Sequence, residues 1–324
     1  MRMAAIPPVE RMTEKPAIAV IGAGLMGAGI ALVFAAACCR VALYDAMTEP
    51  RASALSRIRD NLKAIGLDPA AAAAVTLHSQ LAMAVADADF VIEAAPEDLG
   101  LKQALFSEIE DAAKPTAVLA SNTSVIPITS IMQKLRNKAR ALGTHWWNPP
   151  YLVPLVEVIR TVDTSDATLE ATLRLLASVG KTAVEVKKDV PGFIGNRLQH
   201  ALWREAVALV ADGVCDAKTV DDVVKASFGT RLAVLGPLEN ADLVGIDLTR
   251  SIHNYVLPAL DRSTAASPYL DRLVEEGRLG FKSGEGFRKW PSEQQAALRE
   301  RVTKHLQASF GAPVSSGSDD VGQT

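Results

Sequence analysis

The stretch "GTHWWNPPYLVPLVEVIRT", residues 143–161, combines residue types that could move a proton. It holds one of the 5 histidines of the chain, His145, beside two of its 4 tryptophans, and its single carboxylate is Glu157. A histidine titrates near neutral pH, and a carboxylate on its second ring nitrogen would fix its tautomer and stabilise the imidazolium. Glu157 interrupts the alternating apolar run "LVEVI", where a core residue is expected. Either both are ordinary surface residues or they meet, and the surrounding elements must decide.

A glycine-rich turn near the start of the chain predicts a phosphate-binding site. In "AIAVIGAGLMGAGI", a short β-branched run precedes Gly22, Gly24 and Gly27, and an alanine-rich helix follows. A dinucleotide-binding turn needs this context, because its glycines permit a tight turn, close approach of the pyrophosphate and close packing of helix on strand. The free N–H groups of the helix N-terminus would face the phosphates, although a purely structural turn is the alternative. We expect these residues to bind the cofactor: Gly22, Gly24, Leu25, Met26 and Gly27.

The next expected strand, "RVALYD", ends in a carboxylate. Asp45 stands at about the spacing expected for the acid that binds the adenosine ribose hydroxyls, although it could also be an unrelated surface residue. Ala46, Met47 and Thr48 follow, so no lysine or arginine directly after Asp45 would hold a 2′-phosphate. The pattern therefore favours NAD over NADP.

Strand and helix patterns alternate through this half of the chain. Further strands are expected in "DFVIEAAPE", "TAVLASNTS", "RALGTHWW" and "TAVEV", with helical patterns such as "LKQALFSEIEDAA" between several of them. This alternation predicts an α/β, Rossmann-type, doubly wound and mostly parallel sheet, in which ligands gather at the carboxyl ends of the strands. Four polar residues come just after expected strand ends, and we expect them to converge on one crevice: Glu97, Asn122, Ser124 and His145.

The pattern becomes wholly helical near Val190–Pro191, where Pro-Gly breaks the alternation. An all-α C-terminal domain is therefore expected. Its first helix, from Asn196, carries a stripe predicted to lie in the core, formed by Leu198, Leu202, Val207 and Val210. The expected organisation is a flexible lead-in at 1–15, an NAD-binding domain at 16–189, a helical domain at 190–310 and a disordered tail at 311–324.

Composition limits the function classes. A chain of 324 residues with 22% charged residues and a net charge of -3 has no electrostatic footprint for nucleic acid or an anionic membrane. No stretch approaches a transmembrane helix or a signal-peptide core. The 3 cysteines, two of them adjacent at Cys38 and Cys39, offer neither a disulfide framework nor metal-ligand spacing. We expect a cytoplasmic protein with a small-molecule substrate and no metal.

Taken together, the motifs resemble the L-3-hydroxyacyl-CoA dehydrogenase family. The similarity runs from about Pro16 to Trp290 through "GAGLMGAGI", "VIEAAPED", "SNTSVIPITSI", "HWWNP", "LVEVI", "DVPGFIGNRL", "GPLENADLVGIDL" and "GFKSGEGF" in one order. No single element is specific, but eight in sequence are. The resemblance implies a Rossmann-type domain followed by a helical domain that mediates dimerisation, and an activity on the L form of the substrate.

The resemblance also assigns roles to residues. His145 matches the catalytic histidine of the family and Glu157 its carboxylate partner, so it implies that the two meet. Ser124 and Asn196 match residues that contact the substrate oxygen and the nicotinamide region, where polar groups would stabilise charge on the carbinol oxygen. On the cofactor side we expect Asp45, Glu97, Lys102 and Asn122. At the substrate we expect Trp146, Asn148 and Arg57 in addition to Ser124 and Asn196.

Three departures from the family concern the substrate. The helical hairpin expected at 47–77 is shorter than in fatty-acyl members, and in place of their lysines it offers Arg51, Arg57, Arg59 and Lys63. Pro154 stands where CoA-specific members often carry lysine, and two tryptophans replace the usual phenylalanines of "HWWNP".

These departures leave the substrate undecided, and we consider three hypotheses for the function of the protein. The leading one is NAD-dependent oxidation of an L-3-hydroxyacyl-CoA in fatty acid metabolism. The alternative is oxidation of a free hydroxy acid or alcohol, as in the carnitine, gulonate or pyridine-carboxylate dehydrogenases that the "NPP…P" pattern resembles. A non-catalytic binding or structural role is the third hypothesis. The intact set of His145, Glu157, Ser124 and Asn196 argues against it, because a purely structural role would not require all four.

Overall fold

The computed structural model describes residues 15–310. The expected tail at 311–324, and the lead-in expected at 1–15 except for its last residue, lie outside the described residues. One eight-stranded sheet has the strand order β3-β2-β1-β4-β5-β6-β7-β8. All neighbouring strands are parallel except β6 and β7, which are antiparallel. The strands are β1 (Ile18–Ile21), β2 (Val41–Tyr44), β3 (Val75–His78), β4 (Phe90–Glu93), β5 (Val118–Ser121), β6 (Ala141–Trp146), β7 (Leu155–Ile159) and β8 (Thr182–Val186).

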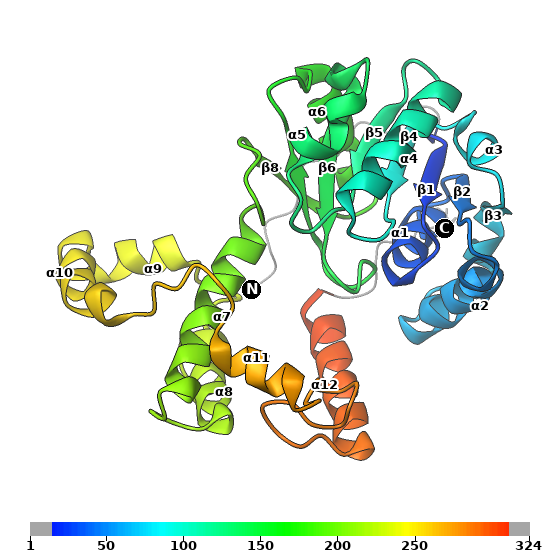
Figure 1. The fold of residues 1–324 in the computed structure, drawn as a ribbon. Coiled ribbons are helices and arrows are strands. Elements are labelled where there is room, and N and C mark those ends of the chain that lie inside the picture. Colours follow the sequence, from blue (N-terminus) through cyan, green and yellow to red (C-terminus); the bar gives the residue numbers. More distant parts are fainter. Residues whose placement is uncertain (1–14, 311–324) are drawn as a thin grey trace, which may run out of the picture. The chain divides into compact units, whose positions relative to one another are not determined.

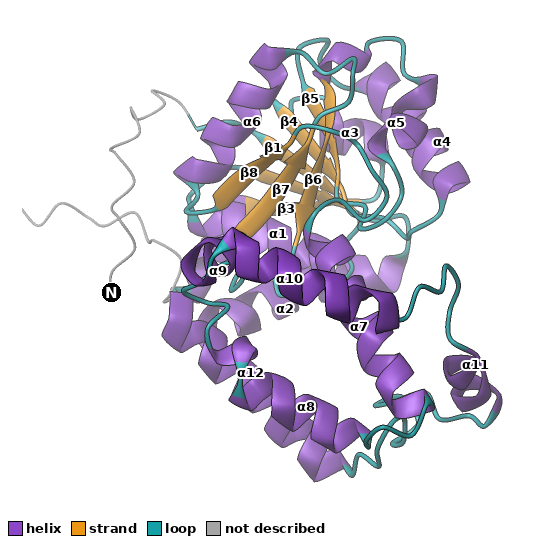
Figure 2. Cartoon of the chain, turned by 90° about the vertical axis from the view of Figure 1, so that its left-hand side faces the viewer, coloured by secondary structure: helices purple, strands orange, loops and turns teal. Residues whose placement is uncertain are grey.

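Helices cover both faces of this sheet (Figures 1 and 2). Successive residues of a strand point to opposite faces, so in β1 Ile18 and Val20 join one core while Ala19 and Ile21 join the other. The first core is completed by α1 (Leu25–Ala36), α2 (Thr48–Ala64) and α6 (Asp166–Ser178). The second is completed by α3 (Leu81–Val85), α4 (Leu99–Ala112) and α5 (Ile128–Ile131). The predicted doubly wound architecture is confirmed.

The chain direction over the sheet reverses beside β1, which pairs with β2 on one side and with β4 on the other. At such a switch point the loops after neighbouring strands diverge and leave a crevice at the carboxyl ends. The glycine-rich turn follows β1 and the segment after Glu93 follows β4, so both lie at this edge.

The hairpin expected at 47–77 is wrong. A single helix, α2, ends before Gly66, whose φ of +77° lies in the left-handed region that favours glycine. Pro69–Ala74 then forms one stretch of 3₁₀ helix, and the β-branched "VTLH" forms β3, which pairs in parallel with β2. The alanine run is helical, but the residues after it, "VTLH", pair with the edge strand β2 and do not continue a second helix.

The chain divides into two compact units, one made of residues up to 196 together with those from 303 on, and one made of 197–302. The division falls inside α7, and the end of α12 belongs to the first unit: Leu306 packs against its core, and Gln307 Nε2 donates to the Ala64 carbonyl at 2.9 Å. The remaining helices are α7 (Gly195–Ala211), α8 (Ala217–Ala226), α9 (Pro237–Val244), α10 (Ile246–Val256), α11 (Pro268–Glu275) and α12 (Ser292–Phe310).

The second unit leaves most of its apolar side chains open. Between residues 197 and 302, Leu273 is the one apolar side chain that is buried. The predicted core stripe of α7 is therefore wrong for the single chain: Leu198 is 60% exposed, Leu202 is 39% exposed, and Val207 and Val210 are half-buried. The helical period identifies an apolar face but does not say what covers it.

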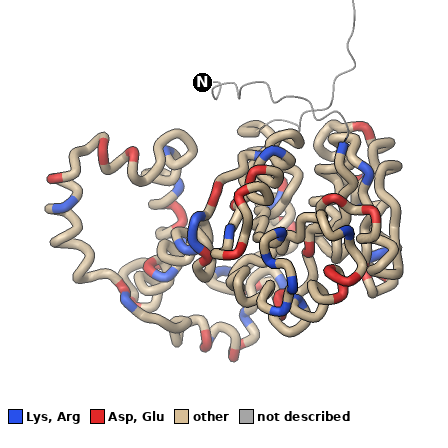
Figure 3. Tube along the Cα trace, turned by 90° about the horizontal axis from the view of Figure 1, so that it is seen from above, with Lys and Arg blue, Asp and Glu red and all other residues tan. Residues whose placement is uncertain are grey.

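Acidic and basic residues are interspersed along the trace of both units (Figure 3). None of the described helices has both the length and the apolar character needed to cross a membrane.

Candidate active site

His145 and Glu157 lie directly opposite each other in the antiparallel ladder of β6 and β7. His145 Nδ1 is 2.7 Å from Glu157 Oε2, and the two residues are 4% and 1% exposed. A carboxylate inside an apolar strand is costly unless it is paired, and this pairing explains why Glu157 interrupts the run "LVEVI". Of the two sequence interpretations, the structure shows the one in which the residues meet.

The environment of Glu157 fixes the tautomer of His145. Burial by itself would raise the pKa of Glu157, but hydrogen bonds from His145 and from the N–H groups of Gly195 and Ile194 outweigh it and lower the pKa below its ordinary value. An ionised carboxylate only accepts hydrogen bonds, so Nδ1 must carry the proton that faces it. The other ring nitrogen, Nε2, is then left with a free lone pair that can accept a proton.

A cavity of about 330 Å³ lies in front of the His145–Glu157 pair. A space of this size is at the lower end for small-molecule sites. Its lining comes from four places in the chain: the start of α1, the loop after β5, the end of β6 with the residues that follow it, and the start of α7. The lining residues are Leu25, Met26, Ser124, His145, Trp146, Trp147, Asn148 and Asn196. Most of the predicted substrate residues and the first turn of the predicted cofactor helix therefore share one cavity.

The loop that carries Ser124 is held from two sides. Asn196 Nδ2 donates to the Ser124 carbonyl at 2.9 Å. On the other side, Glu97 Oε1 accepts from the Thr123 hydroxyl at 2.5 Å and from the N–H groups of Ser124 and Val125 at 2.9 and 3.1 Å. Burial would raise the pKa of Glu97, but these hydrogen bonds and the charge of Lys102 lower it. Glu97 is therefore ionised, and its carboxylate holds this loop through three hydrogen bonds.

Lys102, expected on the cofactor side, is fully buried behind Glu97. Its ammonium group donates to Glu93 Oε1 at 2.6 Å and to the Ala95 carbonyl at 3.1 Å, and it lies 3.5 Å from Glu97 Oε2. Glu93 Oε2 in turn accepts from the Ser121 hydroxyl at 2.6 Å. Lys102 therefore contacts Glu97, which holds the Ser124 loop, but it has no exposed surface that could contact a cofactor directly.

The glycine-rich turn has the close contacts that its pattern predicts. A Cβ on Gly27 would lie 1.7 Å from the Gly22 carbonyl oxygen, and a Cβ on Gly22, whose φ is +105°, would lie 2.6 Å from the Ala94 oxygen. Gly24 is different, because a Cβ there would meet nothing within 4 Å. Its space is open above the N-terminus of α1, where a pyrophosphate would approach the backbone. The turn fits a dinucleotide.

Asp45 organises this turn. Its Oδ2 accepts from the Ala23 N–H at 2.7 Å and its Oδ1 from the Met47 N–H at 2.8 Å. No lysine or arginine directly follows Asp45, but the first turn of α2 brings Arg51 Nη1 to 2.5 Å from the Asp45 carbonyl oxygen. Arg51 is six residues after Asp45 in the sequence, and the turn of the helix brings its guanidinium back to the Asp45 carbonyl.

Arg57, expected at the substrate, lies instead at the glycine-rich turn. Its Nη2 donates to the Ala23 carbonyl at 2.5 Å and to the Pro50 carbonyl at 3.0 Å. It does not line the 330 Å³ cavity. The regular course of α2 across α1 places the Arg57 side chain over the turn, where it links the Ala23 and Pro50 carbonyls.

The two tryptophans of "HWWNP", the last residue of β6 and the residue after it, have different surroundings. The ring of Trp146 is buried in the first core against Phe34, with centroids 5.8 Å apart, so little of it can meet a substrate. Trp147 packs beside His145, with ring centroids 5.3 Å apart. The expectation of a substrate contact therefore shifts from the Trp146 ring to Trp147.

Two asparagines also have distinct positions. Asn122 is almost buried, and its Oδ1 accepts from the Trp146 N–H at 2.9 Å, which ties the end of β5 to β6. Asn148 is exposed and lines the cavity.

Residues that sequence reasoning missed include Glu93 and Phe193. Glu93 ends the otherwise apolar strand "FVIE", which is the same signal that identified Glu157. Phe193 is buried with its ring centroid 5.6 Å from that of His145, and an apolar residue in a loop carries no comparable signal.

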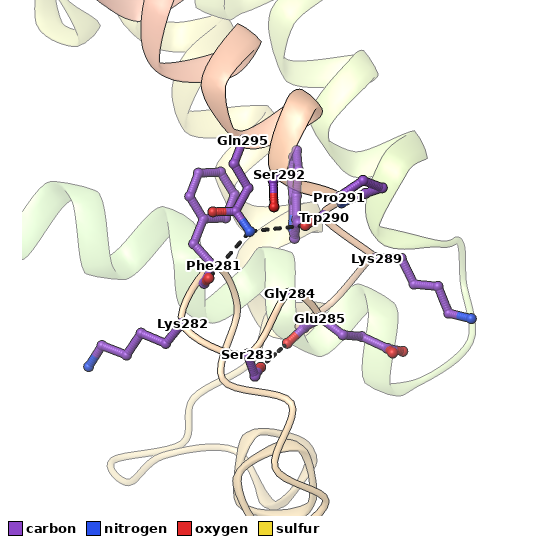
Figure 4. A pocket seen from close by; sticks show the side chains of 10 residues that line it. All are labelled: Phe281, Lys282, Ser283, Gly284, Glu285, Lys289, Trp290, Pro291, Ser292 and Gln295. Atoms are coloured by element: carbon purple, nitrogen blue, oxygen red, sulfur yellow. Dashed lines mark hydrogen bonds between the residues drawn. The ribbon is translucent and has the colours of Figure 1, made fainter.

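A second hollow, of about 710 Å³, lies within residues 281–295 of the second unit. The Gln295 amide donates to the Phe281 and Trp290 carbonyls, and the side chains of Lys282 and Lys289 extend in opposite directions (Figure 4). These contacts close the turn and bring no reactive groups together. In the part of the chain that the structure describes, no group of His, Cys, Asp and Glu is placed to hold a metal ion.

Comparison with known proteins identifies the family. Residues 17–190 match the NAD-binding domain of 3-hydroxyacyl-CoA dehydrogenase, and residues 192–290 match its C-terminal domain. The chain belongs to the 3-hydroxyacyl-CoA dehydrogenase family. The resemblance inferred from eight motifs is confirmed, and with it an NAD-dependent oxidoreductase that acts on a CH–OH group of a small molecule.

Two proteins and one solved structure are similar to this chain over most of its length. The chain is 36% identical over 296 residues to 5-formyl-3-hydroxy-2-methylpyridine 4-carboxylate 5-dehydrogenase of Mesorhizobium japonicum, covering 90% of this chain and 96% of that protein. It is 36% identical over 278 residues to a probable 3-hydroxybutyryl-CoA dehydrogenase of Bacillus subtilis, covering 83% and 96%. A crystal structure of the pyridine-carboxylate enzyme, an NAD⁺-dependent dismutase, has a TM-score of 0.84 at 35% identity and covers 91% of this chain and 97% of that one.

Proposed function

We propose that the protein oxidises a CH–OH group of a small, CoA-free acid or alcohol, with His145 Nε2 as the general base. The observation that carries the proposal is the buried His145–Glu157 pair, which leaves Nε2 as the proton acceptor at the wall of the cavity. NAD, when bound, supplies the acceptor for the hydride. His145 takes the hydroxyl proton as the carbonyl forms, and Glu157 stabilises the imidazolium that results.

Ser124 and Asn196 are assigned to the carbinol oxygen. Both line the cavity with His145, and a polar group that meets this oxygen would stabilise the charge that develops on it. The hydrogen bond between Asn196 Nδ2 and the Ser124 carbonyl would orient both residues before substrate arrives. In the reverse direction the protonated His145 returns its proton to the same oxygen.

The cofactor side is assigned to the edge of the sheet beside β1. The open face of Gly24 and the N-terminus of α1 would take the pyrophosphate, with Leu25 and Met26 beside it and Asp45 at the adenosine ribose. Glu97 and Lys102 would support this side from beneath, and Asn122 would fix the end of β5.

The hydrogen bonds of the basic residues in α2 favour a substrate without CoA. CoA phosphates need cations that are free to pair with them. Arg51 and Arg57 donate to backbone carbonyls of the turn that they brace, and Pro154 stands at the position where lysine would suit CoA. The similarity to a dehydrogenase of a free pyridine carboxylate, with a TM-score of 0.84, points the same way.

An L-3-hydroxyacyl-CoA is the second candidate substrate. The probable 3-hydroxybutyryl-CoA dehydrogenase of Bacillus subtilis is as similar in sequence as the pyridine-carboxylate enzyme. Arg59 and Lys63 are exposed on α2 and could meet a phosphate. This candidate would place the enzyme in fatty acid metabolism.

We also propose that the protein is a cytoplasmic homodimer formed through its helical unit. Many apolar residues of 197–302 are exposed in the single chain, and large exposed apolar patches usually mark an interface. Among the described residues Cys38, Cys39 and Cys215 are in no disulfide bond, which suits a reducing compartment.

The test is a substrate panel in both directions. NADH consumption is measured with acetoacetyl-CoA, free acetoacetate and 3-dehydrocarnitine, and NAD reduction with hydroxy acids and hydroxymethyl pyridine carboxylates. We expect turnover of a free acid or alcohol and none of the thioester, with no inhibition by CoA. Turnover of the thioester alone would replace the first candidate by the second.

A further inference from the structure

Glu157 has a second set of partners besides His145. Its Oε1 accepts hydrogen bonds from the backbone N–H groups of Ile194 at 2.9 Å and Gly195 at 3.0 Å, while Oε2 faces His145 Nδ1 at 2.7 Å. One oxygen is therefore held by the backbone and the other by the imidazole. Rotation of the carboxylate would break both contacts, so its orientation is fixed before any ligand binds.

The two N–H groups belong to a segment with an uncommon backbone conformation. Gly192 has φ +74° and Phe193 has φ +50°, and the left-handed region is unfavourable for a residue with a Cβ. Left-handed residues let successive N–H groups converge on one anion. Phe193 is held in this conformation by burial of its ring against His145. Strain of this kind is kept where the surrounding structure requires it.

The last residue of the segment is packed against Trp147. A Cβ on Gly195 would lie 2.3 Å from Trp147 Cζ2, closer than real Cβ contacts come. Trp147 itself contacts His145. Trp147 and Phe193 therefore flank the imidazole, and the absence of a side chain at 195 lets the backbone reach Glu157.

We propose that the segment from Gly192 to Gly195 is a positioning element of the catalytic pair, with Gly195 required because Trp147 packs on its Cα. The inference rests on the proposed role of His145 as base. The amides hold Glu157 ionised and aimed at Nδ1, which keeps Nε2 available as the proton acceptor. A methyl group at 195 would push the backbone away from Oε1 and let the carboxylate turn.

Few other charged groups act on the pair. Among the described residues, the groups that hydrogen-bond to Glu157 are His145 and the two amides, and β8 places Val184 opposite it. Ser124 and Asn196 on the cavity wall are neutral, and Glu97 with Lys102 lies behind the Ser124 loop. In the variants below, a change in the hydrogen bond between His145 and Glu157 therefore involves the amides or Trp147, which also contacts His145, and no other charged group.

The experiment compares wild type with Gly195→Ala, Trp147→Phe and the double variant Gly195→Ala/Trp147→Phe. Two quantities are measured: kcat with the substrate found in the panel, and the strongly deshielded NMR resonance of the proton on His145 Nδ1, assigned by its loss in His145→Ala. The resonance needs no turnover, so it tests the positioning element even if the proposed activity fails. Melting temperature checks that each variant is folded.

Gly195→Ala should lower kcat by ~10- to 100-fold, the size of effect that a small misplacement of a catalytic group produces, and should move or broaden the resonance. Removing part of the indole makes room for the methyl group, so the double variant should match Trp147→Phe in both quantities. If Gly195→Ala does not fold, this second comparison carries the test. A wild-type resonance and kcat in Gly195→Ala would overturn the proposal, and so would a double variant without the resonance.

Discussion

Glu157 Oε2 and His145 Nδ1 lie 2.7 Å apart across two antiparallel strands, at directly paired positions. Because the carboxylate is ionised and can only accept, one tautomer of the imidazole is selected, and its free nitrogen is the one that can act as a base.

Replacing Glu157 by glutamine should retain the fold and remove most of the activity. The glutamine oxygen can accept from the Ile194 and Gly195 amides, but its NH₂ would then face His145 and select the opposite tautomer. We expect kcat to fall by roughly 10³- to 10⁴-fold, as when the carboxylate of a hydrolase triad becomes an amide. Steady-state NADH formation measures the effect, and Glu185→Gln on β8, outside the site, is the matched control. Equal activity of the two variants would show that Glu157 does not orient the base.

Lys102→Met should destabilise the first unit strongly. It removes the cation that lies between Glu93 and Glu97 and leaves the Glu93 carboxylate buried without its charge partner. Breaking a buried ion pair by removing one partner costs about 3–5 kcal/mol in the free energy of unfolding. Denaturant titration measures this, with Lys114→Met as control. The side chains of the Lys114–Asp89 pair are 39% and 46% exposed, so this pair is expected to contribute less than about 1 kcal/mol. A small loss in Lys102→Met would mean that water reaches the buried cluster.

Lys181 should make the stability of the protein rise with pH above 8. Its ammonium group donates to the Pro150 and Val153 carbonyls, and burial lowers its pKa from 10.5 to about 8. Between these values the unfolded chain binds more protons than the folded one, so raising the pH favours the folded state, by on the order of 3 kcal/mol in total. Unfolding free energies are measured from pH 7 to about 10.5 in wild type and in Lys181→Met, which should lack this rise. The exposed Lys187→Met is the control, and parallel curves for wild type and Lys181→Met would contradict the prediction.

Asp45→Ser should relax the choice of cofactor. The carboxylate that is assigned to the ribose hydroxyls would repel a 2′-phosphate, and Arg51 lies beside it. Without the carboxylate, the ratio of kcat/KM for NAD over NADP should fall by ~10-fold or more, the value of a hydrogen bond to a charged group. An unchanged ratio in Asp45→Ser would exclude this role for the carboxylate.

Patterns that are local in sequence predicted the fold well. The order of strands and helices, the glycine-rich turn and the carboxylate inside "LVEVI" each follow from side-chain periodicity or from a charge in an apolar run. The strand β3 was missed because an alanine run precedes it, and its strand state depends on pairing with β2.

Contacts made at a distance could not be predicted in the same way. Arg57 reaches the Ala23 carbonyl only because α2 crosses α1, and a guanidinium on a helix face carries no sign of its target. The Phe193 ring beside His145 and the return of Leu306 to the first core likewise depend on where a loop or a helix ends in space. For Leu198 and Leu202, the amphipathic pattern was correct, but the single chain does not cover them.

The central claim is that His145 accepts the substrate proton during hydride transfer. It is tested most directly by following NADH formation in a single turnover of the NAD-loaded enzyme, in wild type and in His145→Ala, with the exposed His200→Ala as control. The account predicts that His145→Ala forms NADH ~10²- to 10⁴-fold more slowly while its Kd for NADH is unchanged, and that His200→Ala behaves as wild type. NADH formation by His145→Ala at the wild-type rate would contradict it.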